Sequence, residues 1–211
     1  MLGRRSLARV ERQQLCDAAL AVGPDAPTLC GDWDVRDLLA HLLVRERSPL
    51  GAAGIQVAPL SPLTDRAMDR ATSREFPALV EAVRKARTPL ALPLVDDVVN
   101  TLEFFVHHED IRRAQPGWAP RALSRAEESA LWTAIKVGGR GLVRPAAVPV
   151  TIRRADGGAT AVLRGGADPV VLTGLPSEIV LFLFGRRQTR GLSLTGPDTA
   201  IAALRAADLG L

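Results

Sequence analysis

The segment NTLEFFVHHEDIRR, residues 100–113, combines side chains that can bind a metal ion. Glu103 and His107 lie four residues apart, and Asp110 lies three residues beyond His107. In a helix these spacings place all three side chains on one face, whereas His108 points about 100° away. A carboxylate and a neutral imidazole one turn apart can both donate lone pairs to one divalent cation. The spacing therefore predicts two metal ligands, Glu103 and His107.

A second helix offers a third ligand. His41 lies in DVRDLLAHLLVRER, at the edge of a leucine stripe with helical spacing. Facing helices of a bundle supply metal ligands together. His41, Glu103 and His107 would leave one coordination position open for water or substrate, which is the arrangement of catalytic zinc sites. Asp110 or Glu109 can orient a ligating imidazole through a hydrogen bond.

A structural role explains the same pattern. Glu-x-x-x-His pairs are common on helices, and the apolar neighbours of Glu103 indicate a buried helix. Buried carboxylates and imidazoles need polar partners, which a Glu–His or Arg–Glu hydrogen-bond network supplies as well as a metal does. From spacing alone, both interpretations stay open. Cys30 is close to the site in sequence, but a buried, apolar thiol explains it better than a ligand or redox role.

Hydrophobic periodicity and helix caps predict the elements that position these side chains. Asp34 suits the N-cap of the helix that carries His41. Ser124 and Glu127 form a capping box, and Pro77 fits only in a first helical turn. The predicted helices span residues 4–22, 64–72, 73–87, 95–115, 124–137, 177–186 and 198–207, with another from 34 onward. The predicted strands span residues 148–154, 160–164, 170–173 and 192–195, and residues 48–64 are predicted to form a loop.

These elements predict an α+β fold in two parts. The long helices of the N-terminal part favour a four-helix bundle. From about residue 145, short strands alternate with helices, and Asp156-Gly157-Gly158 predicts a hairpin turn. The expected domains are a helical metal-binding bundle at residues 1–140 and a small α/β domain at residues 145–211.

The composition argues against several classes of protein. No apolar run approaches the roughly 20 residues that span a bilayer, and the N-terminus has no signal-peptide core. Two cysteines, Cys16 and Cys30, are too few for a disulfide framework, which favours free thiols and a cytoplasmic location. The net charge is +4, but the arginines are scattered, so neither a nucleic-acid partner nor a membrane partner is expected.

Two motifs resemble those of a known family. PTLCGDWDVRDLLAHL, residues 27–42, and EFFVHHEDIRRA, residues 103–114, resemble the DinB/YfiT-like metal-binding bundles, most closely the actinobacterial branch of mycothiol-dependent maleylpyruvate isomerases. The resemblance implies that the metal ligands are His41, Glu103 and His107. Residues 170–187 and 194–211 resemble the small sterol-carrier-like α/β domain that accompanies this bundle, so the resemblance covers nearly the whole chain.

Enzymes of this family join a low-molecular-weight thiol such as mycothiol to an electrophile, or use it to isomerise a double bond. The resemblance therefore implies a divalent metal, a mycothiol-type co-substrate and an electrophilic substrate, in an S-transferase or an isomerase. Arg45 and Asp110 are the further candidate catalytic residues. Arg45 would bind a carboxylate of thiol or substrate, although a surface salt bridge to Glu46 or Asp37 explains it equally well.

Several alternatives stay open. Residues 45–50 and the loop that follows differ from the isomerase pattern, so the isomerase substrate is not carried over. Zinc suits a two-histidine, one-glutamate site, but nickel, iron and manganese can enter it. A non-catalytic protein that binds metal or a small molecule is the main alternative, and an iron oxygenase is a third. A monomer and a homodimer are both compatible with the sequence.

Overall fold

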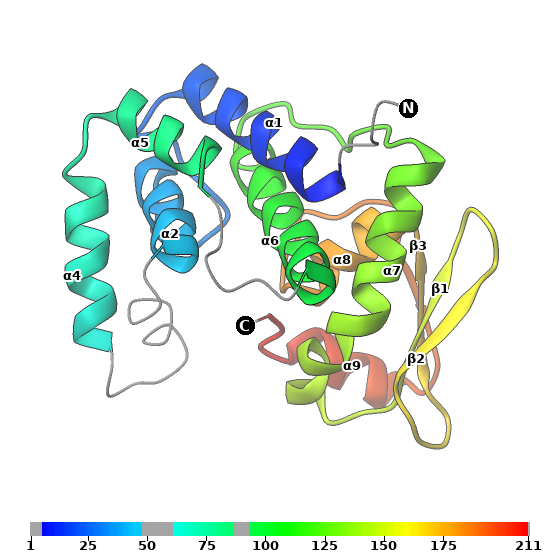
Figure 1. The fold of residues 1–211 in the computed structure, drawn as a ribbon. Helices are drawn as coiled ribbons and strands as arrows, with labels where there is room; N and C mark the ends of the chain where they lie inside the picture. Colours follow the sequence, from blue (N-terminus) through cyan, green and yellow to red (C-terminus); the bar gives the residue numbers. More distant parts are fainter. Residues whose placement is uncertain (1–5, 48–60, 87–92, 211) are drawn as a thin grey trace. The chain divides into compact units, whose positions relative to one another are not determined.

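The structure is a computed structural model that describes residues 6–47, 61–86 and 93–210 (Figure 1). The chain divides into two compact units, one of Met1–Asp97 with His107–Trp118 and one of Val98–Val106 with Ala119–Leu211. A helical N-terminal region followed by a small mixed sheet confirms the predicted α+β class. The domain boundary expected between residues 140 and 145 stays a prediction.

The first unit is helical. Its elements are α1 (Leu7–Val22), α2 (Val35–Arg47), α4 (Ser61–Thr72), α5 (Phe76–Arg84) and the two ends of α6 (Pro93–Arg113), up to Asp97 and from His107. Helix α2 packs against α4 and α5, and α5 packs against α1. The predicted cap of α2 is confirmed, because the Asp34 side chain accepts a hydrogen bond from the backbone N–H of Asp37 at 2.9 Å.

Two helix boundaries in this unit differ from the prediction. Helix α4 starts at Ser61, inside the predicted loop, because Pro62 fits a first helical turn; residues 48–60 of that loop lie outside the described residues. Helix α5 starts at Phe76 rather than Ser73. The Ser73 hydroxyl donates to the Arg70 carbonyl at 3.1 Å, so Ser73 belongs to the end of α4. Pro77 lies in the first turn of α5, as predicted.

The second unit contains a mixed sheet of four strands (Figure 1). The strands are β1 (Val150–Arg154), β2 (Thr160–Arg164), β3 (Val170–Gly174) and β4 (Ser193–Thr195), in the order β2-β1-β3-β4. The β1–β2 and β3–β4 pairs are antiparallel, and β1–β3 is parallel. Alternate residues of β1 and β3 are buried, which gives the sheet one core face.

The helices of this unit are the middle of α6 (Val98–Val106), α7 (Arg125–Leu142), α8 (Pro176–Leu183) and α9 (Asp198–Ala206), with the short 3-10 helix η2 (Arg144–Ala146). Helix α7 contacts α8 and β2, and α8 contacts β3. The capping box of Ser124 and Glu127 is confirmed. Helix α8 ends at Leu183 because Gly185 adopts a φ of +80°, and a Cβ there would lie 2.4 Å from the Leu209 carbonyl oxygen.

Helix α7 continues beyond its predicted end at residue 137, through three glycines. A Cβ on Gly138 would lie 3.1 Å from the Leu102 side chain, and one on Gly139 would lie 3.1 Å from Leu163. The missing side chains allow leucines to pack closely against the helix backbone. Tertiary packing therefore overrides the low helix propensity of glycine. No helix among the described residues is long and apolar enough to cross a membrane.

A buried carboxylate joins α7 to α8. Glu128 of α7 accepts hydrogen bonds from the Ser177 backbone N–H at 2.9 Å and from the Ser177 hydroxyl at 2.8 Å. Ser177 lies in the first turn of α8, where the free N–H groups and the helix dipole favour a negative charge. Burial nevertheless raises the pKa of Glu128 above its ordinary value, while the bonds from Ser177 act in the opposite direction.

The raised pKa predicts how stability depends on pH. The folded state holds the Glu128 proton at a pH where the unfolded state has lost it, so rising pH removes stability. We expect the free energy of unfolding of the wild type to fall relative to Glu128→Gln as pH rises from about 4 to about 7. Urea denaturation of both proteins across this range measures the difference. A difference that stays constant, or grows in favour of the wild type, would contradict the prediction.

Candidate metal centre

Helix α6 presents its polar side chains from an apolar segment. Phe104, Phe105 and Val106 are buried. The predicted burial of this helix is therefore confirmed, although Glu103 and His107 themselves are half-buried. The helical spacing places them one turn apart on the same side of α6. A half-buried carboxylate and imidazole can be reached by an ion or a small molecule.

The structure brings the three predicted ligands together. His41 of α2, Glu103 and His107 each offer a ligand atom, and these atoms all lie within 4.8 Å of one another. The ring centroids of His41 and His107 are 5.5 Å apart, with the planes at 74°. Glu103 is held beside His107 by the continuous helix that both share. Nitrogen and carboxylate ligands in a group of this size match the donor set of a zinc site.

Asp110 fixes the orientation of His107. Its side chain is completely buried, and its Oδ2 lies 2.9 Å from the His107 Nδ1. Because this bond occupies Nδ1, the His107 nitrogen left for a ligand is Nε2. Glu109, the other residue considered for this position, instead accepts hydrogen bonds from Arg112 and Arg113. These bonds therefore join Asp110, and not Glu109, to the His107 ring.

Cys30 is the functional candidate that sequence reasoning undervalued. Its thiol is half-buried and donates to the Asp110 Oδ2 at 3.1 Å, and its sulfur lies 3.7 Å from the His107 Nδ1. The interpretation as a buried, apolar thiol is therefore wrong for Cys30. It fits Cys16, whose burial raises its pKa to about 12. Cys30 lies four positions before the cap residue Asp34, and this proximity in the sequence is the signal that points to it.

The loop that contains Cys30 contacts both histidines. Its ends pair through a bridge between Pro27 and Asp34. The Leu29 backbone N–H donates to the Asp110 carbonyl at 3.2 Å, which attaches the loop to α6. At the other end, the ring centroid of Trp33 lies 5.2 Å from that of His41. Residues 27–34, which we call the positioning loop, therefore constrain the side-chain arrangement from outside the two helices.

Arg45 lies on α2, one turn after His41, and is half-buried. The neighbouring Glu46 is buried and forms an ion pair with Arg12 of α1. The structure thus places Arg45 at the predicted position on the helix. Its role in substrate binding stays a prediction.

His108 belongs to a different network. It is buried, and its Nδ1 lies 2.8 Å from the Glu11 Oε2 of α1. Glu11 is also buried, so each group satisfies the other in the core. Helical geometry predicts that His108 points about 100° away from His107. As a consequence, the two histidines have separate partners, Asp110 for His107 and Glu11 for His108. Nothing in the local sequence pointed to Glu11, which lies 97 residues away.

The fold and the arrangement of these side chains define a class of protein: a helical region that carries a candidate metal site, followed by a small mixed sheet. Residues 6–112 match the family described as the mycothiol maleylpyruvate isomerase N-terminal domain. This match covers just over half of the chain. The protein therefore belongs to the mycothiol maleylpyruvate isomerase N-terminal domain family.

The solved structures confirm the fold. The chain is similar to the crystal structure of the mycothiol-dependent maleylpyruvate isomerase, with a TM-score of 0.60 and 13% identity, over 90% of each chain. A mutant of this isomerase matches with a TM-score of 0.60 and 14% identity, again over 90% of each chain. A comparison with curated protein sequences returned no match. At such low identity, these likenesses describe the fold alone.

The separation of His108 from the candidate site predicts a purely structural effect of its removal. We expect Glu11→Ala and His108→Ala each to lower the free energy of unfolding by about 2–3 kcal/mol, because each removes a hydrogen bond between two buried groups. The double variant should lose less than the sum of the two. Urea denaturation measures these losses, with Asp17→Ala on the exposed face of α1 as the control. Additive losses would show that the two side chains do not stabilise each other.

Proposed function

We propose that this protein is a divalent-metal-dependent enzyme that uses a low-molecular-weight thiol of the mycothiol type, as an isomerase or an S-transferase. The observation that carries the proposal is the convergence of His41, Glu103 and His107 in a chain of this family. Their donor atoms suit zinc best, and nickel, iron and manganese are the alternatives. The proposed substrates are the thiol and a small electrophile.

The side chains fit a metal ion for a reason beyond their number. Asp110 already binds the Nδ1 of His107, which favours the tautomer whose Nε2 carries a lone pair. Cys30 donates to the same carboxylate oxygen and so helps to hold it in place. Two histidines and one glutamate also leave room in the coordination shell for an exogenous ligand. A bound divalent ion would hold the thiol as thiolate, which is the nucleophilic form, near neutral pH.

The remaining roles fall to residues around this group. We assign Asp110 the positioning of His107 and Arg45 the binding of a carboxylate on the thiol or the electrophile. Arg45 suits this task because its planar guanidinium can donate two parallel hydrogen bonds. Mycothiol and maleylpyruvate, which the names of the family and of the solved relatives supply, are the first pair to test as substrates.

The metal content of the purified protein tests the first part of the proposal. We expect about one ion per chain in protein prepared without a histidine tag, and loss of that ion in His41→Ala and Glu103→Ala. Asp110→Ala should weaken binding by about 10- to 100-fold, because the ring it orients becomes free to turn. Elemental analysis and competition with a chromophoric chelator measure both effects.

His108→Ala is the matched control, since it removes a histidine from the same helix without touching the proposed ligands. It should retain the metal. A wild type that takes up no ion after dialysis against zinc at neutral pH would overturn the proposal, and the three side chains would then form a structural network. Retention of the ion by folded His41→Ala and Glu103→Ala would place any metal elsewhere.

Turnover tests the second part. We expect conversion of an electrophile such as maleylpyruvate only when metal and thiol are both present, and recovery of activity when zinc is returned to chelator-treated protein. Arg45→Ala should raise KM without loss of metal, whereas Arg47→Ala, an exposed change on the same helix, should leave KM unchanged. Bound metal without turnover, for a panel of thiols and electrophiles, would favour the alternative of a non-catalytic binding protein.

A further inference from the structure

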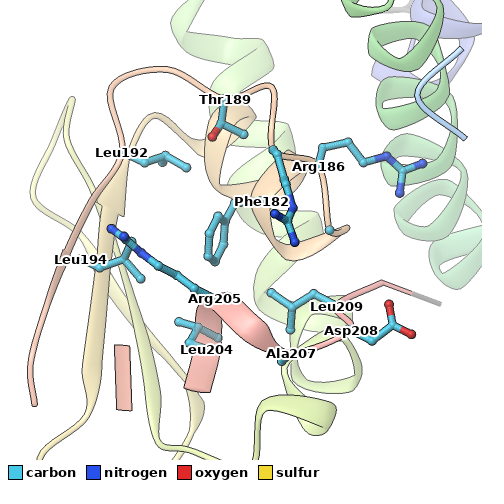
Figure 2. Close-up of a pocket in the computed structure, with 12 residues that line it drawn as sticks. Phe182, Arg186, Thr189, Leu192, Leu194, Leu204, Arg205, Ala207, Asp208 and Leu209 are labelled. Carbon is cyan, nitrogen blue, oxygen red and sulfur yellow. The ribbon is translucent and has the colours of Figure 1, made fainter. Parts of the chain in front are cut away.

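One pocket lies wholly within the second unit of the chain (Figure 2). It has a volume of about 480 Å³ and is bounded by the end of α8, the segment around β4 and the end of α9. Its apolar lining comes from Phe182, Leu192, Leu194, Leu204 and Leu209. All of these except Leu204 are only half-buried. A ligand that covers these large apolar side chains removes apolar surface from water, which lowers the free energy of the complex. The volume is within the range of small-molecule sites.

The polar lining of this pocket is predominantly cationic. Three arginines, Arg186, Arg187 and Arg205, line it together with a single carboxylate, Asp208. In the part of the chain that the structure describes, the side chains of Arg187 and Arg205 form no hydrogen bond or ion pair. Figure 2 shows Arg205 extending from α9 toward Leu194, while the Asp208 carboxylate points away from the Phe182 ring. Among the described residues, the charges of Arg187 and Arg205 beside this apolar surface are therefore not paired with a carboxylate.

We propose that this pocket binds a small organic anion that has an apolar body and a carboxylate head. The body would cover Phe182 and the leucines, and the carboxylate would pair with the guanidinium groups of Arg187 and Arg205. Arginine is suited to this pairing because its fork matches the two carboxylate oxygens. This second site is independent of the proposed metal centre, since none of its lining residues belongs to that group.

The two halves of the lining exclude simpler ligands. A free phosphate or another fully hydrated anion would leave Phe182 and Leu194 exposed to water. A neutral apolar molecule would leave the arginine charges uncompensated beside it, and an organic cation would meet repulsion from three guanidinium groups. An amphipathic carboxylate satisfies both halves, which is why we select this class.

Calorimetric titration of the full-length protein with octanoate, octanol and octylammonium tests the proposal. These probes share an apolar chain and differ in the charge of the head. We expect octanoate to bind one site per chain, octanol to bind more weakly, and octylammonium not to bind. Arg205→Glu and Arg187→Glu should each weaken octanoate binding by about tenfold or more, because each reverses a charge at the proposed head-group site.

Two variants make the outcome decisive. Arg153→Glu, an equal charge reversal at an exposed position of β1 outside the pocket, should keep the wild-type affinity. His41→Ala should also keep it, because His41 lies at the candidate metal centre. The proposal is overturned if octanoate does not bind, if octylammonium binds as well as octanoate, or if Arg205→Glu and Arg153→Glu behave alike. Loss of octanoate binding in His41→Ala would show that octanoate binds at the candidate metal centre, and this result would also overturn the proposal.

Discussion

The hydrogen bond between Asp110 and His107 is the constraint on which the rest of the candidate site depends. Asp110 is completely buried, and an isolated carboxylate in that position would be strongly destabilising. It is tolerated because His107, Cys30 and α6 surround it with compatible groups. The same contacts order the site. They attach the positioning loop to α6, and the bond to Nδ1 fixes the orientation of the His107 ring. Stability and geometry therefore arise from one interaction.

Helix α6 keeps three sets of polar contacts apart on its different faces. His107 and Asp110 contact Cys30, and His108 contacts Glu11. Glu109 contacts Arg112 and Arg113, which lie in the last turn of α6. Residues 107 to 110 therefore divide among three separate groups of partners, and the rotation of about 100° per residue keeps these groups apart. A rigid scaffold of this kind supports a site whose own ligand atoms remain partly open to solvent.

Sequence reasoning succeeded where the physics is local. Helical spacing was enough to place Glu103, His107 and Asp110 on one face, and the cap at Asp34 followed from its side chain. It failed where distant segments decide the outcome. The bond from Cys30 to Asp110 spans 80 residues, and no periodicity reports such a contact. The end of α7 was misplaced because leucines from two other elements pack against its glycines, and local propensity contains no such information.

The metal and structural interpretations of the site make different demands on the same side chains. A structural network explains fully buried groups that lack water, as it does for His108 and Glu11. His41, Glu103 and His107 are half-buried, so each can be reached from solvent as well as from its neighbours in the protein. Their convergence from two helices, with a buried carboxylate behind one ring, therefore fits both interpretations. Coordination of an ion requires all three donor atoms to be directed to one point, whereas a structural network requires only pairwise contacts between the side chains.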